Sequence, residues 1–110
     1  MKCLHIITPV KDSIDSTLET VKAIMESDIL VPFTYTVYND FSTEENTHRL
    51  EEAARQWNFR LVNLSDLTDH PSPNYLLVLQ TAQKEAIEAD AGLLIVESDV
   101  IVKKKTFQSL

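Results

Sequence analysis

Residues 4–25, LHIITPVKDSIDSTLETVKAIM, join two hydrophobic patterns across a single proline. Residues 4–8 form a short, β-branched apolar run, which predicts a strand that stops at Pro9. Asp12, with Asp15 three residues later, predicts the capped start of a helix. The apolar side chains of that helix recur at helical spacing and form one stripe: Ile14, Leu18, Val21 and Met25. A strand followed by an amphipathic helix is the repeating unit of parallel α/β sheets.

The same alternation continues along the rest of the chain. Residues 33–40 alternate in polarity and are rich in β-branched and aromatic residues, which predicts a second strand. Residues 59–64 and 93–97 are the third and fourth predicted strands, the last one following Gly92. The order β-α-β-α-β-α-β predicts an α/β fold, a three-layer, open and mostly parallel sheet with right-handed crossovers, built by residues 1–110 as one domain.

The two later helices also have sequence signals at their starts. Ser42, with Glu45 three residues later, predicts a capping box, and Ser72 with Pro73 predicts a cap followed by proline at the first helical position. The second helix is expected to bury Leu50, Ala53, Ala54 and Trp57. The third is expected to bury Leu76, Leu79, Ala82, Gln83 and Ala86.

Composition excludes several classes of function. A formal net charge of −7 argues against binding to a nucleic-acid backbone, which requires clustered cations. Gly92 is the single glycine, so neither a P-loop nor a glycine-rich dinucleotide turn can form. The longest apolar runs, YLLVL and GLLIV, are far shorter than the ~20 residues of a membrane helix. A single cysteine, Cys3, is typical of the reducing cytoplasm.

Polar residues follow three of the predicted strands. The first strand ends in Thr8-Pro9, the second in Asn39-Asp40 and the fourth in Glu97-Ser98-Asp99. Ligands of open parallel sheets bind outside the carboxyl ends of the strands. Two carboxylates directly after an apolar strand need a cation to offset their desolvation, and hard oxygen ligands suit Mg²⁺ or Mn²⁺.

Three segments, IITPVKDSIDSTLETVKAI, VYNDFSTEENT and LLIVESDV, together resemble the opening signatures of family-2 glycosyltransferases of the GT-A fold. The resemblance implies that the chain is the N-terminal part of such an enzyme. It implies an inverting enzyme that binds a nucleotide-diphosphate sugar, most simply a UDP-sugar, through Mn²⁺ or Mg²⁺. It also implies a cytoplasmic or membrane-peripheral location and a role in polysaccharide synthesis.

The resemblance also assigns roles to individual residues. Asp40 matches the aspartate that hydrogen-bonds the base, and Thr8 and Pro9 match the turn that flanks the nucleotide. Glu97 and Asp99 match the Asp-x-Asp motif, with Asp99 as the metal ligand and a glutamate in place of the first aspartate. This sequence departs from the family at two further positions. Phe41 replaces a glycine, which forces a different turn or a side chain over the pocket, and Val10 stands where an aromatic residue often stacks near the base.

The general base and the acceptor-binding part follow the Asp-x-Asp motif in this family. Residues 105–110, KTFQSL, predict the beginning of a helix, so we expect the 110 residues to be a donor-binding fragment of a longer enzyme. The face that the missing part would cover favours a homodimer.

Alternatives remain at this point. The chain would also suit a non-catalytic α/β ligand-binding or signalling module, or a nucleotidyltransferase. Several residues also have purely structural interpretations: Asp40 as a helix cap, Glu97 and Asp99 as solvated strand ends, and Thr8 as a turn residue.

Overall fold

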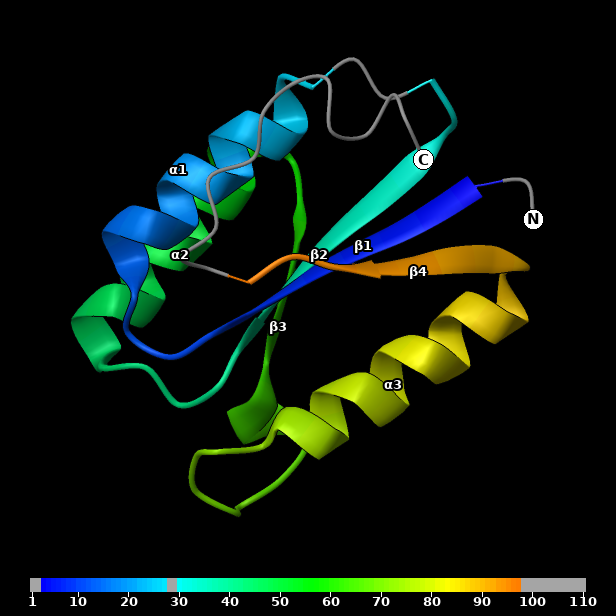
Figure 1. The fold of residues 1–110 in the computed structure, drawn as a ribbon. Helices are drawn as coiled ribbons and strands as arrows, with labels where there is room; N and C mark the ends of the chain where they lie inside the picture. Colours follow the sequence, from blue (N-terminus) through cyan, green and yellow to red (C-terminus); the bar gives the residue numbers. More distant parts are fainter. Residues whose placement is uncertain (1–2, 28–29, 98–110) are drawn as a thin grey trace.

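The computed structural model describes residues 3–27 and 30–97, which form a sheet with helices on both faces (Figure 1). The helices and strands alternate along the chain in the predicted order. They are β1 (Cys3–Val10), α1 (Ile14–Met25), β2 (Phe33–Asn39), α2 (Glu44–Trp57), β3 (Arg60–Asn63), α3 (Tyr75–Glu88) and β4 (Ala91–Ile95), with a 3-10 turn at Leu64–Asp66. All three strand pairs are parallel, in the order β3-β2-β1-β4. The predicted α/β fold and parallel sheet are confirmed.

β1 is longer than predicted, because Pro9 lies inside the strand instead of ending it. The Val96 amide donates to the Ile7 carbonyl (2.9 Å), and the Asp40 amide donates to the Val10 carbonyl (2.7 Å). The N–H and C=O groups of successive residues in a strand point alternately to the two neighbouring strands. The backbone of Pro9 therefore points toward β4, as that of Ile7 does. β4 stops pairing opposite Ile7, and the N–H that proline lacks is therefore not needed at this position.

The two faces of the sheet have separate cores. α1 and α2 cover one face, and α3 covers the other (Figure 1). The α1/α2 side contains eleven buried hydrophobic residues in one cluster, among them Ile6, Val37 and Leu50. The α3 side contains five: Ile7, Tyr38, Leu64, Val78 and Ala82. Both faces of the central strands are thus buried, as expected of a parallel sheet.

The helix starts differ from the predictions. The N-cap of α1 is Ser13, that of α2 is Thr43 and that of α3 is Asn74, so Asp12, Ser42 and Ser72 do not act as caps. Of these three N-cap residues, only Thr43 caps with its side chain, by accepting from the Asn46 amide at 3.3 Å.

The predicted buried stripe of α3 is confirmed at Ala82 and Ala86 and is wrong at Leu76, which is 67% exposed, and at Gln83, which is also exposed. The helix also buries Val78. Apolar residues fill five consecutive positions at the start of this helix, so periodicity there does not define which face is buried. The stripe of α2 is confirmed at Leu50 and Ala53. Within the described ranges, no helix has both the length and the apolar composition of a membrane span.

Candidate functional site

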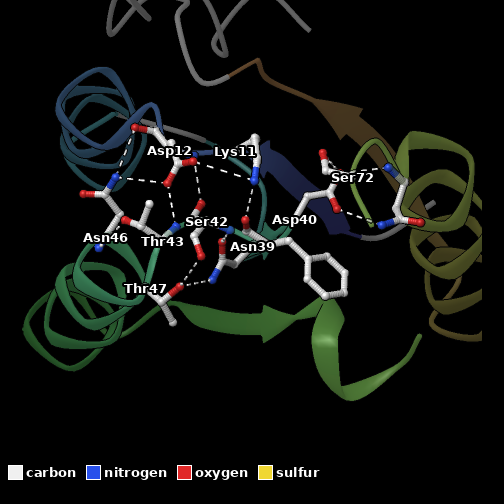
Figure 2. A network of polar contacts seen from close by, with 11 residues as sticks. Lys11, Asp12, Asn39, Asp40, Ser42, Thr43, Asn46, Thr47 and Ser72 are labelled. Atoms are coloured by element: carbon white, nitrogen blue, oxygen red, sulfur yellow. Dashed lines mark hydrogen bonds and ion pairs between the residues drawn. The ribbon is translucent and has the colours of Figure 1, made fainter. Parts of the chain in front are cut away.

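The carboxyl ends of β1 and β2 lie side by side, and polar side chains gather there (Figure 2). Val10 and Asn39 are register partners in the last pair of the two strands. The loops that follow lead to α1 and α2, and they carry Lys11, Asp12 and Asp40. Because ligands of open parallel sheets bind at this edge, this group of side chains is the candidate functional site.

Asp40 is buried at this edge and accepts three hydrogen bonds. Its Oδ2 accepts from the Ser72 hydroxyl (3.0 Å) and the Asn74 backbone amide (2.8 Å), and its Oδ1 accepts from Asn74 Nδ2 (2.9 Å). We call these three residues the Asp40 anchor. They tie the end of β2 to the start of α3, so Asp40 does not cap α2. An ionised carboxylate accepts about four hydrogen bonds, so one acceptor position on Oδ1 has no partner among the described residues.

A second network joins the two loops on the α1/α2 side (Figure 2). Asp12 Oδ1 accepts from the Thr43 amide (2.7 Å) and from Asn46 Nδ2 (3.1 Å), and the Asp12 amide donates to Ser42 Oγ (2.8 Å). We call Asp12, Ser42, Thr43 and Asn46 the interloop lock. The Thr43 backbone N–H, followed by the Asn46 side chain, lowers the pKa of Asp12 below its ordinary value. The lock fixes the two loops relative to each other.

Asn39 stands at the position where the glycosyltransferase pattern has an aspartate, and its contacts explain the amide. Its Nδ2 donates to Thr47 Oγ1 (2.8 Å) and to Asn63 Oδ1 (2.9 Å), while its Oδ1 accepts from the Ser42 amide (3.2 Å). A carboxylate only accepts hydrogen bonds. Asn39 is therefore a structural residue that joins β2 to β3 and α2, and it faces away from Asp40.

Phe41 has a left-handed backbone conformation, with φ of 60°. This conformation costs about 1–2 kcal/mol for a residue with a side chain, whereas glycine adopts it readily. Phe41 therefore makes a turn that glycine would also make, and the different turn expected from the replacement of glycine is not observed. The Lys11 ammonium donates to the Phe41 carbonyl and lies 3.7 Å from Asp12 Oδ2. Lys11 is half exposed, and it places a cation at this edge of the sheet.

Thr8 and Pro9 lie at the end of β1, but Thr8 faces the core. Thr8 is fully buried, and its Oγ1 accepts a hydrogen bond from the Tyr35 hydroxyl at 2.8 Å. Burial raises the pKa of Tyr35. Pro9 is partly buried on the opposite, α3 side of the strand. A contact between either residue and a nucleotide stays a prediction, and for Thr8 that contact would have to come from the backbone.

Glu97 follows β4 and is exposed. Its Oε1 accepts a hydrogen bond from the Tyr75 hydroxyl at 3.4 Å, which links the end of β4 to the start of α3. Asp99, the other expected metal ligand, lies outside the described residues, as does the segment 105–110. Within residues 3–27 and 30–97, no three His, Cys, Asp or Glu side chains are arranged to hold a metal ion. Glu97 is a hard oxygen donor that suits Mg²⁺ or Mn²⁺, and metal binding stays a prediction.

Sequence reasoning missed the partners of Asp40 and the lock around Asp12. Ser72 and Asn74 are more than thirty residues from Asp40 in sequence, so no local pattern connects them. Lys11 and Asp12 follow the first strand directly, and their position at a strand end is the signal by which they could have been found.

The arrangement defines a class of fold, an open parallel α/β sheet with a polar carboxyl edge, and solved structures share it. No family model matches the chain, and no curated protein matches its sequence. The chain is similar to Staphylococcus aureus TarS, a family-2 glycosyltransferase. The match to TarS residues 1–349 has a TM-score of 0.66 and 21% identity, and covers 99% of this chain and 31% of that one.

Two further TarS structures give the same result. Residues 1–349 in complex with UDP-GlcNAc match with a TM-score of 0.65 and 23% identity, over 99% of this chain and 30% of that one. A longer TarS chain matches with a TM-score of 0.64 and 22% identity, over 99% of this chain and 18% of that one. The chain thus spans less than a third of the TarS chains. At this level of identity the likeness establishes the fold, and the expected GT-A-like architecture is confirmed.

Proposed function

We propose that the chain binds a nucleotide-diphosphate sugar at the carboxyl edge of its sheet, as the donor-binding part of a family-2-like glycosyltransferase. The observation that carries this proposal is the position of Asp40. Its buried carboxylate lies at the end of β2, beside two loops fixed by the interloop lock, and within the described residues one acceptor position on Oδ1 has no partner. The TarS fold, which this chain shares, has been solved in complex with UDP and UDP-GlcNAc.

Each polar group at this edge has a role in the proposal. Asp40 accepts a hydrogen bond from the imide N–H of a uracil base, which makes a UDP-sugar the preferred donor. Lys11 attracts the diphosphate, which otherwise meets an acidic protein. Thr8 and Pro9 flank the nucleotide through the β1 backbone.

A divalent ion, Mn²⁺ or Mg²⁺, is part of the proposal because the single charge of Lys11 does not balance a diphosphate beside carboxylates. Glu97 and Asp99 would hold it. When bound, such an ion stabilises the charge that develops on the departing nucleoside diphosphate. The protein's own contribution is to bind and orient the donor.

Transfer to an acceptor hydroxyl with inversion requires a general base and an acceptor surface. We place both outside these 110 residues, in further chain of a longer, cytoplasmic or membrane-peripheral enzyme of polysaccharide synthesis, which would also set any homodimer contact. The second candidate is a non-catalytic module that binds the same ligand. The observation that favours it is that Asp40 has a structural role: its carboxylate accepts three hydrogen bonds from Ser72 and Asn74.

Calorimetric titration tests the proposal. UDP, GDP and UDP-GlcNAc are titrated with and without Mn²⁺ into the wild type, Asp99→Asn and Glu97→Gln. Glu88→Gln is the matched control, because Glu88 is an exposed carboxylate in the last turn of α3. We expect Mn²⁺ to tighten UDP-GlcNAc binding at least about tenfold, which is 1.4 kcal/mol. Both site variants should lose that gain, and the control should keep it.

Absence of binding to every nucleotide, with or without metal, would overturn the donor-site proposal. Binding that ignores both the metal and the Asp99 variant would overturn the metal assignment alone. Sugar transfer by the longer enzyme, measured as release of UDP in the presence of acceptor, separates the glycosyltransferase from the non-catalytic module.

A further inference from the structure

A group of titratable side chains lies between α3 and the sheet, outside the candidate functional site. His5 on β1 and Arg60 at the start of β3 point to the α3 side, because each is two residues from a strand residue that packs there, Ile7 and Val62 respectively. Glu85 meets them from the second half of α3. Glu85 and Arg60 both lie close enough to His5 to act on its charge.

Both carboxylate oxygens of Glu85 accept hydrogen bonds. Oε1 accepts from the Tyr38 hydroxyl at 3.0 Å, and Oε2 accepts from Arg60 Nη1. Tyr38 is fully buried, and burial raises its pKa, so this hydroxyl keeps its proton and remains a donor. The side chains of Arg60 and Glu85 are 54% and 30% exposed. An ion pair with this exposure contributes little to stability, because water solvates both charges when the pair opens.

His5 has the opposite surroundings. The residue is 6% exposed, its Nδ1 shares a hydrogen bond with Thr34 Oγ1 at 2.8 Å, and its Nε2 has no partner among the described residues. Burial lowers the pKa of His5, Glu85 opposes this shift and Arg60 adds to it. The imidazole is therefore neutral near pH 7. Once it binds a proton, both ring nitrogens are donors, and a buried cation requires a counter-charge.

Glu85 is the carboxylate that acts on His5. The register partner of His5 on β4 is Leu93, and every residue of β4 is apolar. Thr36 Oγ1 is buried without a partner in the described part of the chain, but it is a neutral acceptor. The titratable side chains of the neighbouring elements on this side of the sheet are Cys3 on β1, Tyr38 on β2, Arg60 on β3, and Glu85 with the exposed Lys84 and Glu88 on α3.

We propose that Glu85 changes partner when His5 binds a proton, so that it releases Arg60 and pairs with the His5 imidazolium. The exchange is favourable because a buried cation without a counter-charge is costly, whereas Arg60 is already half exposed and reaches water when it leaves. Glu85 ties α3 to β3 before the exchange and ties it to β1 afterwards. The group is thus a pH-sensitive switch in the packing of α3, and it does not depend on the donor-site proposal.

NMR titration of the 110-residue chain between about pH 7.5 and pH 4.5 tests the switch. In the wild type we expect the His5 ring signals and the Arg60 Nε–H signal to change with one shared midpoint. Arg60→Gln removes the competing cation and should raise the His5 midpoint by about half a pH unit. Glu85→Gln removes the counter-charge and should lower it by about the same amount or more.

His48→Gln is the matched control, because His48 is an exposed histidine that pairs with a carboxylate, that of Glu52, at 3.1 Å. This variant should leave the His5 midpoint unchanged. Circular dichroism at each pH confirms that the chain stays folded. The two variants on the exposed pair keep the test valid even if a substitution of buried His5 fails to fold.

A shared midpoint that moves in opposite directions in the two variants supports the switch. An Arg60 signal that does not follow the His5 titration would overturn the exchange of partners. An unchanged His5 midpoint in Glu85→Gln would show that another acceptor, Thr36 Oγ1 or water, takes the new N–H, and the pairing would be wrong. A His5 ring that stays neutral throughout the titration would also contradict the proposal.

Discussion

The Asp40 anchor and the interloop lock lie at the same edge of the sheet and differ in burial. Asp40 is 8% exposed, and the hydrogen bonds that its side chain makes within the described residues run to the loop before α3. Asp12, in the lock, is partly exposed and makes bonds of similar length. Water replaces a lost hydrogen bond at an exposed site and cannot do so at a buried one. The anchor should therefore dominate stability, and the lock should mainly set the geometry of the two loops.

Removing the anchor gives the largest expected effect. Asp40→Ala leaves the buried Asn74 backbone amide without its acceptor and leaves Asn74 Nδ2 with only its bond to the His70 carbonyl, and we expect a loss of about 3 kcal/mol in the free energy of unfolding. Urea unfolding followed by circular dichroism measures it. Asp40→Asn should be intermediate, because its Oδ1 still accepts one bond. A loss below about 1 kcal/mol in Asp40→Ala would show that burial does not determine how much these hydrogen bonds contribute to the free energy of unfolding.

A buried group outside the site extends the comparison to pH. His5 Nδ1 bonds to Thr34 Oγ1 at 2.8 Å, and its Nε2 is buried without a partner in the described part of the chain. Burial lowers the pKa of His5 from 6.5, nearby Glu85 opposes the shift, and Arg60 adds to it. The unfolded chain therefore binds a proton first, and the free energy of unfolding should fall as pH drops below about 6.5.

We expect this fall to be smaller than the loss in Asp40→Ala. His5→Gln should abolish the pH dependence between pH 7 and pH 5. A second decrease should follow below the ordinary carboxyl values, since the pKa of Glu85 is also lowered. Burial opposes that shift, but the hydrogen bonds from Arg60 and Tyr38 outweigh it. An unchanged stability from pH 7 to pH 5 in the wild type would contradict the account of His5.

The side-chain cap of α2, made by Thr43 of the lock, supplies the third prediction. The Thr43 backbone amide that donates to Asp12 is kept in both Thr43 variants. Thr43→Ala removes the N-cap acceptor of α2 for the Asn46 amide, and we expect a loss of about 1 kcal/mol. Thr43→Ser keeps the hydroxyl and should stay close to wild type. The measurement is again urea unfolding. A loss as large as that of Asp40→Ala would remove the contrast between the exposed and buried networks.

An exposed ion pair gives the smallest expected effect. Arg49 Nη2 lies 3.1 Å from Asp15 Oδ1, where the two side chains are 42% and 89% exposed. Arg49→Gln should change the free energy of unfolding by less than about 0.5 kcal/mol. A larger change that disappears in high salt would mean that long-range charge, in addition to burial, matters in this acidic chain.

The sequence predicted the element order and the parallel sheet because apolar periodicity alternates cleanly between strands and helices. It also placed Asp40 at a strand end. It did not predict that Thr8 faces the core, because proline is typical of strand ends and Thr8 was therefore expected in a turn. The contacts of the Asp40 anchor were not predicted, because Asp40 and Asn74 are far apart in sequence and come together only in the folded chain. The buried face of α3 was predicted only in part, because every residue from Tyr75 to Leu79 is apolar.

The central claim is that a uridine nucleotide binds at the carboxyl edge of β1 and β2, and amide chemical shifts test it most directly. UDP is added to ¹⁵N-labelled protein, with Mn²⁺ replaced by Mg²⁺ to avoid paramagnetic broadening. We predict that the largest shifts fall on Lys11, Phe41 and Ser42, and on Asn74 in the Asp40 anchor. Shifts concentrated at the amino ends of the strands, around Leu4 and Phe33, or no shifts at millimolar UDP, would contradict the claim.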